Sequence, residues 1–98
     1  MKPLKLWMSR AAINDLEDIW IYTQKHWSER QADRYYRLIM DEINHICTDP
    51  SSGRSYEFLR KGYRASKVKS HLIFYRFKGS VLEVIRILHE RMDISEQL

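Results

Sequence analysis

Positively charged side chains are concentrated in the last third of the chain, which also holds three short apolar runs. Between Arg60 and Leu82 there are seven Lys or Arg and no carboxylate. Arginine makes forked contacts to phosphate or carboxylate, and lysine acts as a point charge. A small sheet with this many cations is expected to meet an acidic partner, and a solvated basic surface is the plain alternative. The cations of this region are Arg60, Lys61, Arg64, Lys67, Lys69, Arg76, Lys78, Arg86 and Arg91.

Two of these arginines, Arg76 and Arg86, lie inside strands that are otherwise apolar. A charged side chain in the middle of a strand is costly unless it is paired or opens onto a concave face. We expect Glu83 or Asp93 to be the structural partner if the arginines are paired. If they are unpaired, their guanidinium groups are free to hold an anion.

His89 directly follows the last apolar run and has the chemistry of a general acid or base beside arginines. A surface or hydrogen-bonded structural histidine is the competing interpretation. The single cysteine, Cys47, falls on an apolar helical position, which is typical of an inert core thiol. The sequence has no glycine-rich phosphate loop, no Ser-His-Asp signature and no histidine with metal-ligand spacing, so we expect no cofactor and no metal.

The pattern of apolar residues predicts one strand, two helices and three further strands, in the order β–α–α–β–β–β. Ser9 and Ser28 are the expected N-caps of the helices, Asp49-Pro50 ends the second helix, and Lys78-Gly79 forms the last hairpin turn. A helical hairpin with apolar stripes needs a surface to cover, and a four-stranded, mainly antiparallel sheet supplies it. We expect the other face of the sheet to hold the cations. The predicted ranges are strand 4–8, helices 10–26 and 28–47, loop 49–62, and strands 63–68, 71–77 and 81–88.

Each predicted helix has one stripe of apolar residues at spacings of three and four, which indicates a buried face. Trp7, Trp20 and Trp27 fall at core or core-edge positions and are interpreted as packing residues. The stripe of the first helix is Ala12, Ile13, Leu16, Ile19 and Trp20, and that of the second is Ala32, Tyr35, Tyr36, Ile39, Ile43, Ile46 and Cys47.

Composition limits the class of protein. At 98 residues we expect a single domain, 1–98, and 44% apolar residues argue against disorder. Residues 1–49 have seven Lys or Arg and eight Asp or Glu, whereas residues 50–98 have ten and five, so the positive field belongs to the second half. One cysteine excludes an internal disulfide, and no apolar run approaches the ~20 residues that span a bilayer. We therefore expect a cytoplasmic protein without a membrane segment.

Four segments together resemble the ParE family of toxins, which belongs to the RelE/ParE superfamily of type II toxin–antitoxin systems. They are residues 9–39, the loop Gly-Tyr-Arg at 62–64, the strand HLIFYR at 71–76 and the closing RILHERMDI at 86–94. The resemblance runs in order over about residues 5–94. It implies the superfamily fold, which agrees with the β–α–α–β–β–β order obtained from the residues.

The resemblance also implies a growth-inhibiting toxin that poisons DNA gyrase and is neutralised, in a hetero-oligomeric complex, by a ParD-like antitoxin. The RelE branch of the superfamily cleaves mRNA in the ribosome, with strand-borne cations and a tyrosine or histidine near the end of the last strand. This sequence has no tyrosine after Tyr75, and Glu90 places an anion directly after His89. That departure favours a protein inhibitor without catalytic residues.

Two other hypotheses remain open. A ribosome-dependent mRNA endonuclease would use Arg64, Arg76 and Arg86 to stabilise charge and His89 as the acid. A nucleic-acid-binding module would use the cationic sheet and show a steep salt dependence. The candidate contacts to a target or antitoxin are Arg64, Lys67, Lys69, Arg76, Arg86, His89, Arg91, Met92 and Asp93.

Overall fold

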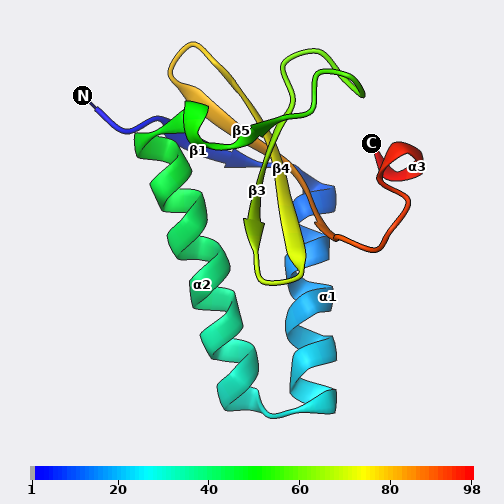
Figure 1. Cartoon of the computed structure of the whole chain (residues 1–98). Helices are drawn as coiled ribbons and strands as arrows, with labels where there is room; N and C mark the ends of the chain where they lie inside the picture. The colour runs from blue at the N-terminus through cyan, green and yellow to red at the C-terminus, as the bar shows by residue number, and fades with distance from the viewer. Residues whose placement is uncertain (1) are drawn as a thin grey trace.

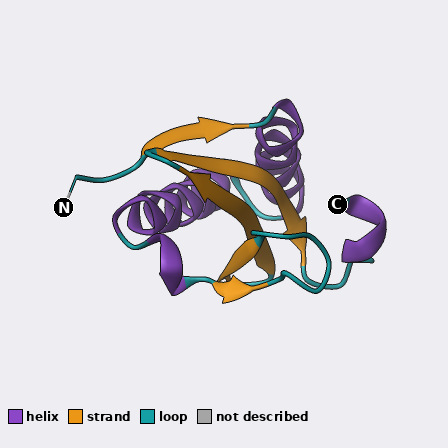
Figure 2. Ribbon diagram, turned by 90° about the horizontal axis from the view of Figure 1, so that it is seen from above, coloured by secondary structure: helices purple, strands orange, loops and turns teal. Residues whose placement is uncertain are grey.

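The computed structural model describes residues 2–98, as two long helices, a five-stranded sheet and a short last helix (Figure 1). Seen from above, the last helix stands apart from the other two (Figure 2). The elements are β1 (Lys5–Met8), α1 (Arg10–His26), α2 (Glu29–Thr48), the 3-10 helix η1 (Pro50–Ser52), β2 (Arg54–Ser55), β3 (Arg64–Val68), β4 (His71–Lys78), β5 (Val81–His89) and α3 (Ile94–Gln97).

Both predicted N-caps of the long helices are confirmed. The Ser9 hydroxyl accepts a hydrogen bond from the Ala12 amide at 2.9 Å, and the Ser28 hydroxyl accepts one from the Gln31 amide at 3.0 Å. Such bonds satisfy amides that have no partner within the helix. The two helices form the predicted antiparallel hairpin, and their joined tips extend beyond the turn between β3 and β4 (Figure 1).

The strands lie in the order β1-β5-β4-β3-β2. β1 is parallel to β5, and the other neighbours are antiparallel, so the prediction of a mainly antiparallel sheet is confirmed. The sheet has one strand more than predicted, because Arg54–Ser55 pairs with the start of β3. A strand of two residues has no periodicity that a sequence pattern could reveal. The helices η1 and α3 were also not predicted.

The main core lies between the long helices and one face of the sheet, which we call the helix-side face. Two residues of the predicted helical stripes lie outside this core, because Ile13 is 47% exposed and Tyr36 is 43% exposed. A third, Trp20, is half-buried, but its Nε1 donates to the Asp33 carboxylate at 2.9 Å and it lines a surface pocket with Ile13 and Tyr36 instead of packing against the core. The remaining stripe residues are buried or half-buried. The buried members of the core are Ala12, Leu16, Ile39, Ile43, Ile46, Cys47, Ile73, Tyr75, Leu82, Val84 and Ile87.

The opposite face of the sheet, which we call the second face, has a much smaller apolar cluster. Its buried members are Ala65, Phe74 and Leu88. The partly buried residues packed against them come from the loop before β3, from β4 and from the end of the chain: Tyr56, Leu72, Ile94 and Leu98. Among residues 2–98, the helix that packs against this cluster is the short α3.

A buried tyrosine fixes the loop that follows α2. The Tyr75 hydroxyl donates to the Pro50 carbonyl at 2.7 Å and accepts from the Gly53 amide at 3.0 Å. A Cβ atom on Gly53 would collide with the hydroxyl and ring of Tyr75. Glycine is therefore required at residue 53 by the space available, and this contact holds β2 in place against β3.

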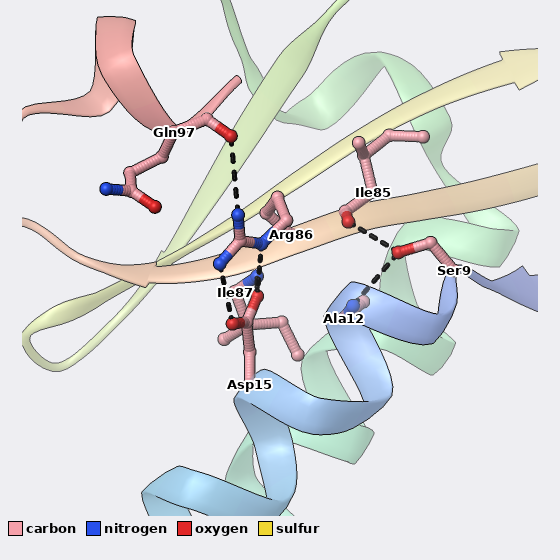
Figure 3. A network of polar contacts seen from close by, with 7 residues as sticks. All are labelled: Ser9, Ala12, Asp15, Ile85, Arg86, Ile87 and Gln97. Carbon is pink, nitrogen blue, oxygen red and sulfur yellow. Dashed lines mark hydrogen bonds and ion pairs between the residues drawn. The ribbon is translucent and has the colours of Figure 1, made fainter.

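Where β1 ends, the N-cap residue and the second turn of α1 contact the edge of β5. A register shift places Phe74 opposite Arg86 and Tyr75 opposite Val84, so that Ile85 is an extra residue of β5. The Ile85 carbonyl accepts a hydrogen bond from the Ser9 hydroxyl at 2.6 Å (Figure 3). The Ile87 amide donates to the Asp15 carboxylate at 2.9 Å. Two side chains thus satisfy backbone groups that a longer β1 would otherwise pair.

Candidate functional site

The arginine in the middle of β5 is paired within the fold. Arg86 Nε lies 2.7 Å from one Asp15 carboxylate oxygen, and Arg86 Nη2 lies 2.8 Å from the other (Figure 3). This ion pair raises the pKa of the Arg86 guanidinium, chiefly through the hydrogen bond to Asp15. The expected partners, Glu83 and Asp93, were wrong for Arg86. The sequence did not indicate that α1, about 70 residues away, would supply the carboxylate.

Arg76 and Lys67 are also paired. Arg76 Nε lies 2.5 Å from the Glu83 carboxylate, directly across the two strands, as expected for one of the two proposed partners. Lys67 Nζ lies 2.8 Å from the Glu90 carboxylate. The hydrogen bond to Lys67 lowers the pKa of the exposed Glu90 carboxyl group. Glu90, the anion after His89, therefore neutralises one of the cations instead of leaving it to a ligand.

Arg64 binds backbone carbonyls of the loop that Tyr75 anchors. Its Nε donates to the Gly53 carbonyl at 3.1 Å, and its Nη2 donates to the Ser51 carbonyl at 3.0 Å. Arg64 lies opposite Tyr75 across β3 and β4, so it belongs to the helix-side face. The prediction that the cations gather on the face without helices is wrong for this residue.

The four residues of the nuclease hypothesis are consequently divided between the two faces of the sheet. Arg86 lies opposite Phe74, and Arg76 lies two residues along the strand from Phe74. Both side chains therefore leave the backbone on the second face. Arg64 lies opposite Tyr75, and His89 pairs with His71 at the end of β4, both on the helix-side face. No point on either face is next to all four side chains.

His89 has a structural contact of its own. Its Nδ1 accepts a hydrogen bond from the Arg91 amide at 3.1 Å, and the Glu90 amide donates to the Ser70 carbonyl at 2.8 Å. These bonds hold the turn that leads from β5 to the end of the chain. The residues of that turn, Arg91, Met92 and Asp93, are exposed, and so are Lys67 and Lys69. Exposure makes them available as contacts for a partner.

A groove opens beneath the β3–β4 turn, where the tip of the helical hairpin extends past the sheet. We call it the histidine groove, and its volume is about 560 Å³. The rings of His71 and His89 meet edge to face in it, with centroids 5.2 Å apart. Its lining residues are Asp18, Ile19, Tyr22, Thr23, Trp27, Gln31, Tyr35, Ser70, His71 and His89.

The histidine groove favours the neutral form of His71. Burial lowers the pKa of His71, and the neighbouring His89 lowers it further. The Tyr35 hydroxyl lies 2.6 Å from His71 Nδ1 and 3.0 Å from the Val68 carbonyl. A phenol has a single hydrogen. If that hydrogen goes to Val68, Nδ1 of His71 must carry its own hydrogen and donate it to Tyr35. Burial also raises the pKa of the Tyr35 hydroxyl.

The sequence did not predict the aromatic wall of this groove. Trp27 is 73% exposed and Tyr22 is 60% exposed, so the prediction that Trp27 packs at the core edge is wrong. Trp7, at 50% exposure, is likewise outside the core. Both helices keep their helical periodicity to the hairpin tip, but the sheet ends before the tip does. Nothing in the local pattern shows where the sheet stops.

Two kinds of function find no support in the described residues. Between residues 2 and 98, no group of three or more His, Cys, Asp or Glu side chains could hold a metal ion. None of the helices in this range is both long enough and apolar enough to cross a membrane. Burial raises the pKa of the Cys47 thiol, so this cysteine is less reactive than a free one.

The fold is shared with two solved structures. It superposes on a chain of the chromosomal ParDE TA system from P. aeruginosa with a TM-score of 0.77 and 18% identity, over 88% of this chain and 95% of that chain. A YoeB/ParE toxin from Agrobacterium tumefaciens gives a TM-score of 0.62 and 23% identity, over 88% and 98%. At these identities the likeness establishes the fold alone.

Sequence comparisons are more specific. Toxin ParE1 of Caulobacter vibrioides is 42% identical over 98 residues, which covers all of this chain and 99% of the relative. Toxin ParE1 of Mycobacterium tuberculosis is 38% identical over 92 residues, which covers 93% of this chain and 94% of the relative. A family model for the ParE toxin of the type II toxin–antitoxin system parDE matches residues 7–94. The chain therefore belongs to the ParE family of type II toxin–antitoxin toxins.

Proposed function

We propose that this ParE-family toxin inhibits DNA gyrase by protein–protein contact, without cleaving a substrate, and that a ParD-like antitoxin neutralises it in a hetero-oligomeric complex. The family supports a toxin paired with an antitoxin. One observation carries the choice of contact over catalysis. The cations that phosphodiester cleavage would require are already bound within the fold and lie on two faces.

A nuclease needs its charges aimed at one phosphate. Arg86 is bound through two of its nitrogens to Asp15, and Arg64 is bound to two carbonyls. Turning either guanidinium toward RNA would break contacts that position β5 or the loop after α2. His89 lies in the histidine groove and accepts a backbone hydrogen bond, so it is not poised beside these arginines.

Protein contact makes different demands, and the surface meets them. The exposed cations Lys69 and Arg91 lie near the β3–β4 turn and the end of β5. Trp27 and Tyr22 supply exposed aromatic area on the adjacent wall of the histidine groove. Aromatic residues and arginine are enriched where proteins bind one another. A basic second half also suits an acidic antitoxin segment.

The direct test titrates purified gyrase with this protein while it supercoils a plasmid, and scores linear DNA in the same gel. Loss of supercoiling together with linear DNA, both reversed by the antitoxin encoded beside the toxin, is the expected result. Unchanged supercoiling with a protein shown to be folded by circular dichroism would contradict the gyrase proposal. Mapping mRNA ends after induction would then test ribosome-dependent cleavage.

A further inference from the structure

The histidine groove contains two ring nitrogens that the fold leaves without a partner. Nδ1 of His71 bonds to the Tyr35 hydroxyl, and Nδ1 of His89 bonds to the Arg91 amide. Within residues 2–98, neither Nε2 has a hydrogen-bond partner. No buried side-chain nitrogen or oxygen in this range lacks a partner, so both Nε2 atoms are reached by solvent. They are therefore open to a ligand in the groove.

The bonds at Nδ1 fix opposite tautomers in the two rings. The Tyr35 hydroxyl has one hydrogen, and the Val68 carbonyl, 3.0 Å away, can only accept it. Nδ1 of His71, 2.6 Å from the same hydroxyl, therefore donates, which leaves a lone pair on Nε2. The Arg91 amide donates to Nδ1 of His89, so the hydrogen of that ring is on Nε2. The groove thus offers one acceptor beside one donor.

The two rings are close enough to bind the same ligand. Their centroids are 5.2 Å apart, and their planes meet at 80°. His71 and His89 are cross-strand partners at the start of β4 and the end of β5, so the backbone pairing fixes their spacing. Burial lowers the pKa of His71, which favours the form with a free lone pair on Nε2. The donor and the acceptor are therefore held in place before any ligand arrives.

The groove also has a flat aromatic wall. Tyr22 and Trp27 line it, and both rings are largely exposed. The Tyr22 ring stacks on His26, with centroids 3.9 Å apart and planes 21° apart, so its orientation is fixed. Exposed aromatic rings stack on other planar rings, and nucleic-acid bases are bound in this way in many proteins. This wall suits a ligand that is itself planar.

Charge and size limit the ligand further. Among the described residues that line the groove, and apart from the two histidines, Asp18 alone carries a formal charge. A carboxylate repels a phosphate group and accepts hydrogen bonds from hydroxyl groups. The groove volume of about 560 Å³ falls in the range of about 300–1,000 Å³ that is usual for small-molecule sites. These properties favour a neutral small molecule over an anion.

We propose that the histidine groove is a binding site for a nucleoside, whose base is a neutral planar heterocycle with a hydrogen-bond donor beside an acceptor. The base donates to Nε2 of His71 and accepts from Nε2 of His89. Its ring stacks on the wall formed by Tyr22 and Trp27, and a sugar hydroxyl donates to Asp18. The inference goes beyond the proposed function and holds whether or not gyrase is the target.

The first measurement tests the tautomers without a ligand. Long-range proton–nitrogen correlation spectra of the full chain distinguish a ring nitrogen that carries a hydrogen from one that has a lone pair. Above neutral pH we expect the hydrogen on Nδ1 of His71 and on Nε2 of His89. The same tautomer in both rings would overturn the proposal, because the groove would then lack its donor and acceptor pair.

The second measurement titrates the full chain with inosine, whose ring N–H lies beside a carbonyl, and follows the amide resonances of Ser70, His71 and His89. The matched probe is 1-methylinosine, which keeps the ring and the sugar but lacks that hydrogen. We expect saturable shifts with inosine and about tenfold weaker binding of 1-methylinosine, the effect of one lost hydrogen bond. Inosine 5′-monophosphate should also bind more weakly than inosine. No saturable shifts with millimolar inosine, equal affinity of the two nucleosides, or tighter binding of the monophosphate would overturn the proposal.

Asparagine variants assign the affinity to the two Nε2 atoms. In His71→Asn and His89→Asn, the amide group replaces Nδ1, so the bonds to Tyr35 and to the Arg91 amide can remain, but nothing replaces Nε2. We expect each variant to bind inosine about tenfold more weakly, and His45→Asn, outside the groove, to bind it normally. Unchanged affinity in both groove variants would contradict the proposal. If circular dichroism shows that they do not fold, the two nucleosides compared on the unaltered protein decide the outcome.

Discussion

The two faces of the sheet are held by different means, although the same strands form both. On the helix-side face, Ile39, Ile43, Ile46, Ile73 and Tyr75 are each 0% exposed beneath two long helices. On the second face, three buried residues lie beneath a four-residue helix and a loop. The apolar burial that stabilises the fold is therefore mainly on one side of the sheet.

Polar contacts follow the same division. On the helix-side face, Arg64 and Tyr75 bind backbone groups of one loop, so each contact fixes the path of the chain. On the second face, Arg76 and Glu83 form a pair whose side chains are 49% and 23% exposed. Exposed pairs contribute about 0–1 kcal/mol. Asp15 joins the two regions, because it reaches from α1 to Arg86 on β5.

The sharpest test compares truncations on the two faces. Ile43→Ala should lower the free energy of unfolding by about 2–5 kcal/mol, because it leaves a cavity in a packed core. Ile94→Ala should lower it by less than about 1 kcal/mol, because its site is partly exposed. Urea unfolding followed by circular dichroism measures both. Equal losses would mean that α3 contributes to the core, contrary to the division described above.

The loop anchor on the helix-side face gives the next effect. Gly53→Ala should lower the free energy of unfolding by about 2 kcal/mol, because its Cβ atom has no room beside Tyr75. In the Tyr75→Phe background the same substitution should cost less, since the hydroxyl that it meets is absent. A double-mutant cycle in urea measures this difference. Additive losses would show that the collision is relieved elsewhere.

The link between the faces is tested by Asp15→Asn. The variant keeps an acceptor for the Ile87 amide but loses the ion pair with Arg86, and we expect a loss of about 2 kcal/mol. Glu83→Gln is the matched control at the exposed pair, with an expected loss below about 1 kcal/mol. Thermal unfolding at low and high salt compares them. If Glu83→Gln costs as much, the exposed pair is more important than its exposure indicates.

The histidine groove predicts a pH dependence. Burial and His89 hold the pKa of His71 below the value of 6.5 that it has when exposed, although Asp15 and Glu90 oppose the shift and Tyr35 packs beside it. The unfolded chain therefore binds this proton more readily than the folded chain does. Stability should be complete above pH 6.5 and fall as the pH drops below it, by at most about 1.4 kcal/mol per pH unit. His71→Gln should flatten this part of a urea-midpoint profile, and an unchanged slope would assign it to other groups.

The smallest effect is expected for His89, the residue that the nuclease hypothesis would use as its acid. His89→Ala should leave growth inhibition in an induced culture nearly unchanged, because His89 supports a turn and faces a groove away from Arg76 and Arg86. Circular dichroism confirms that the variant is folded. A folded His89→Ala protein that no longer inhibits growth would favour catalysis over contact.

The order of the main elements was predictable because each rests on a local signal. The N-cap preference of Ser9 and Ser28 does not depend on where a helix lies in the fold. The apolar stripes of α1 and α2 repeat at the helical period. The partner of Arg86 was not predictable, because Asp15 reaches it only through the parallel pairing of β1 with β5 and the extra residue Ile85. Arg76 shows the contrast, since its partner Glu83 lies across one short hairpin.

The candidate surfaces were predictable in composition but not in placement. The cations of β3 to β5 were visible in the sequence, but the alternation that puts Arg64 on one face and Arg76 on the other depends on register. Trp27 continues the helical spacing of apolar residues. It is exposed to water because the sheet ends before the tip of the helical hairpin. α3 is too short to produce a periodic signal. The packing of Ile94 and Leu98 against the second face can be recognised only from the folded sheet.

The pairing of β1 with β5 has a consequence for how the protein is made. Lys5 lies opposite Val81, and the Ser9 and Asp15 side chains bind the backbone at residues 85 and 87. β1 can therefore join the sheet only after β5, which lies more than 70 residues later in the chain, has been made. Contacts between such distant residues slow folding, because the intervening loop must close first. A ribosome must therefore synthesise residues 81–87 before β1 and the start of α1 can take their places beside β5.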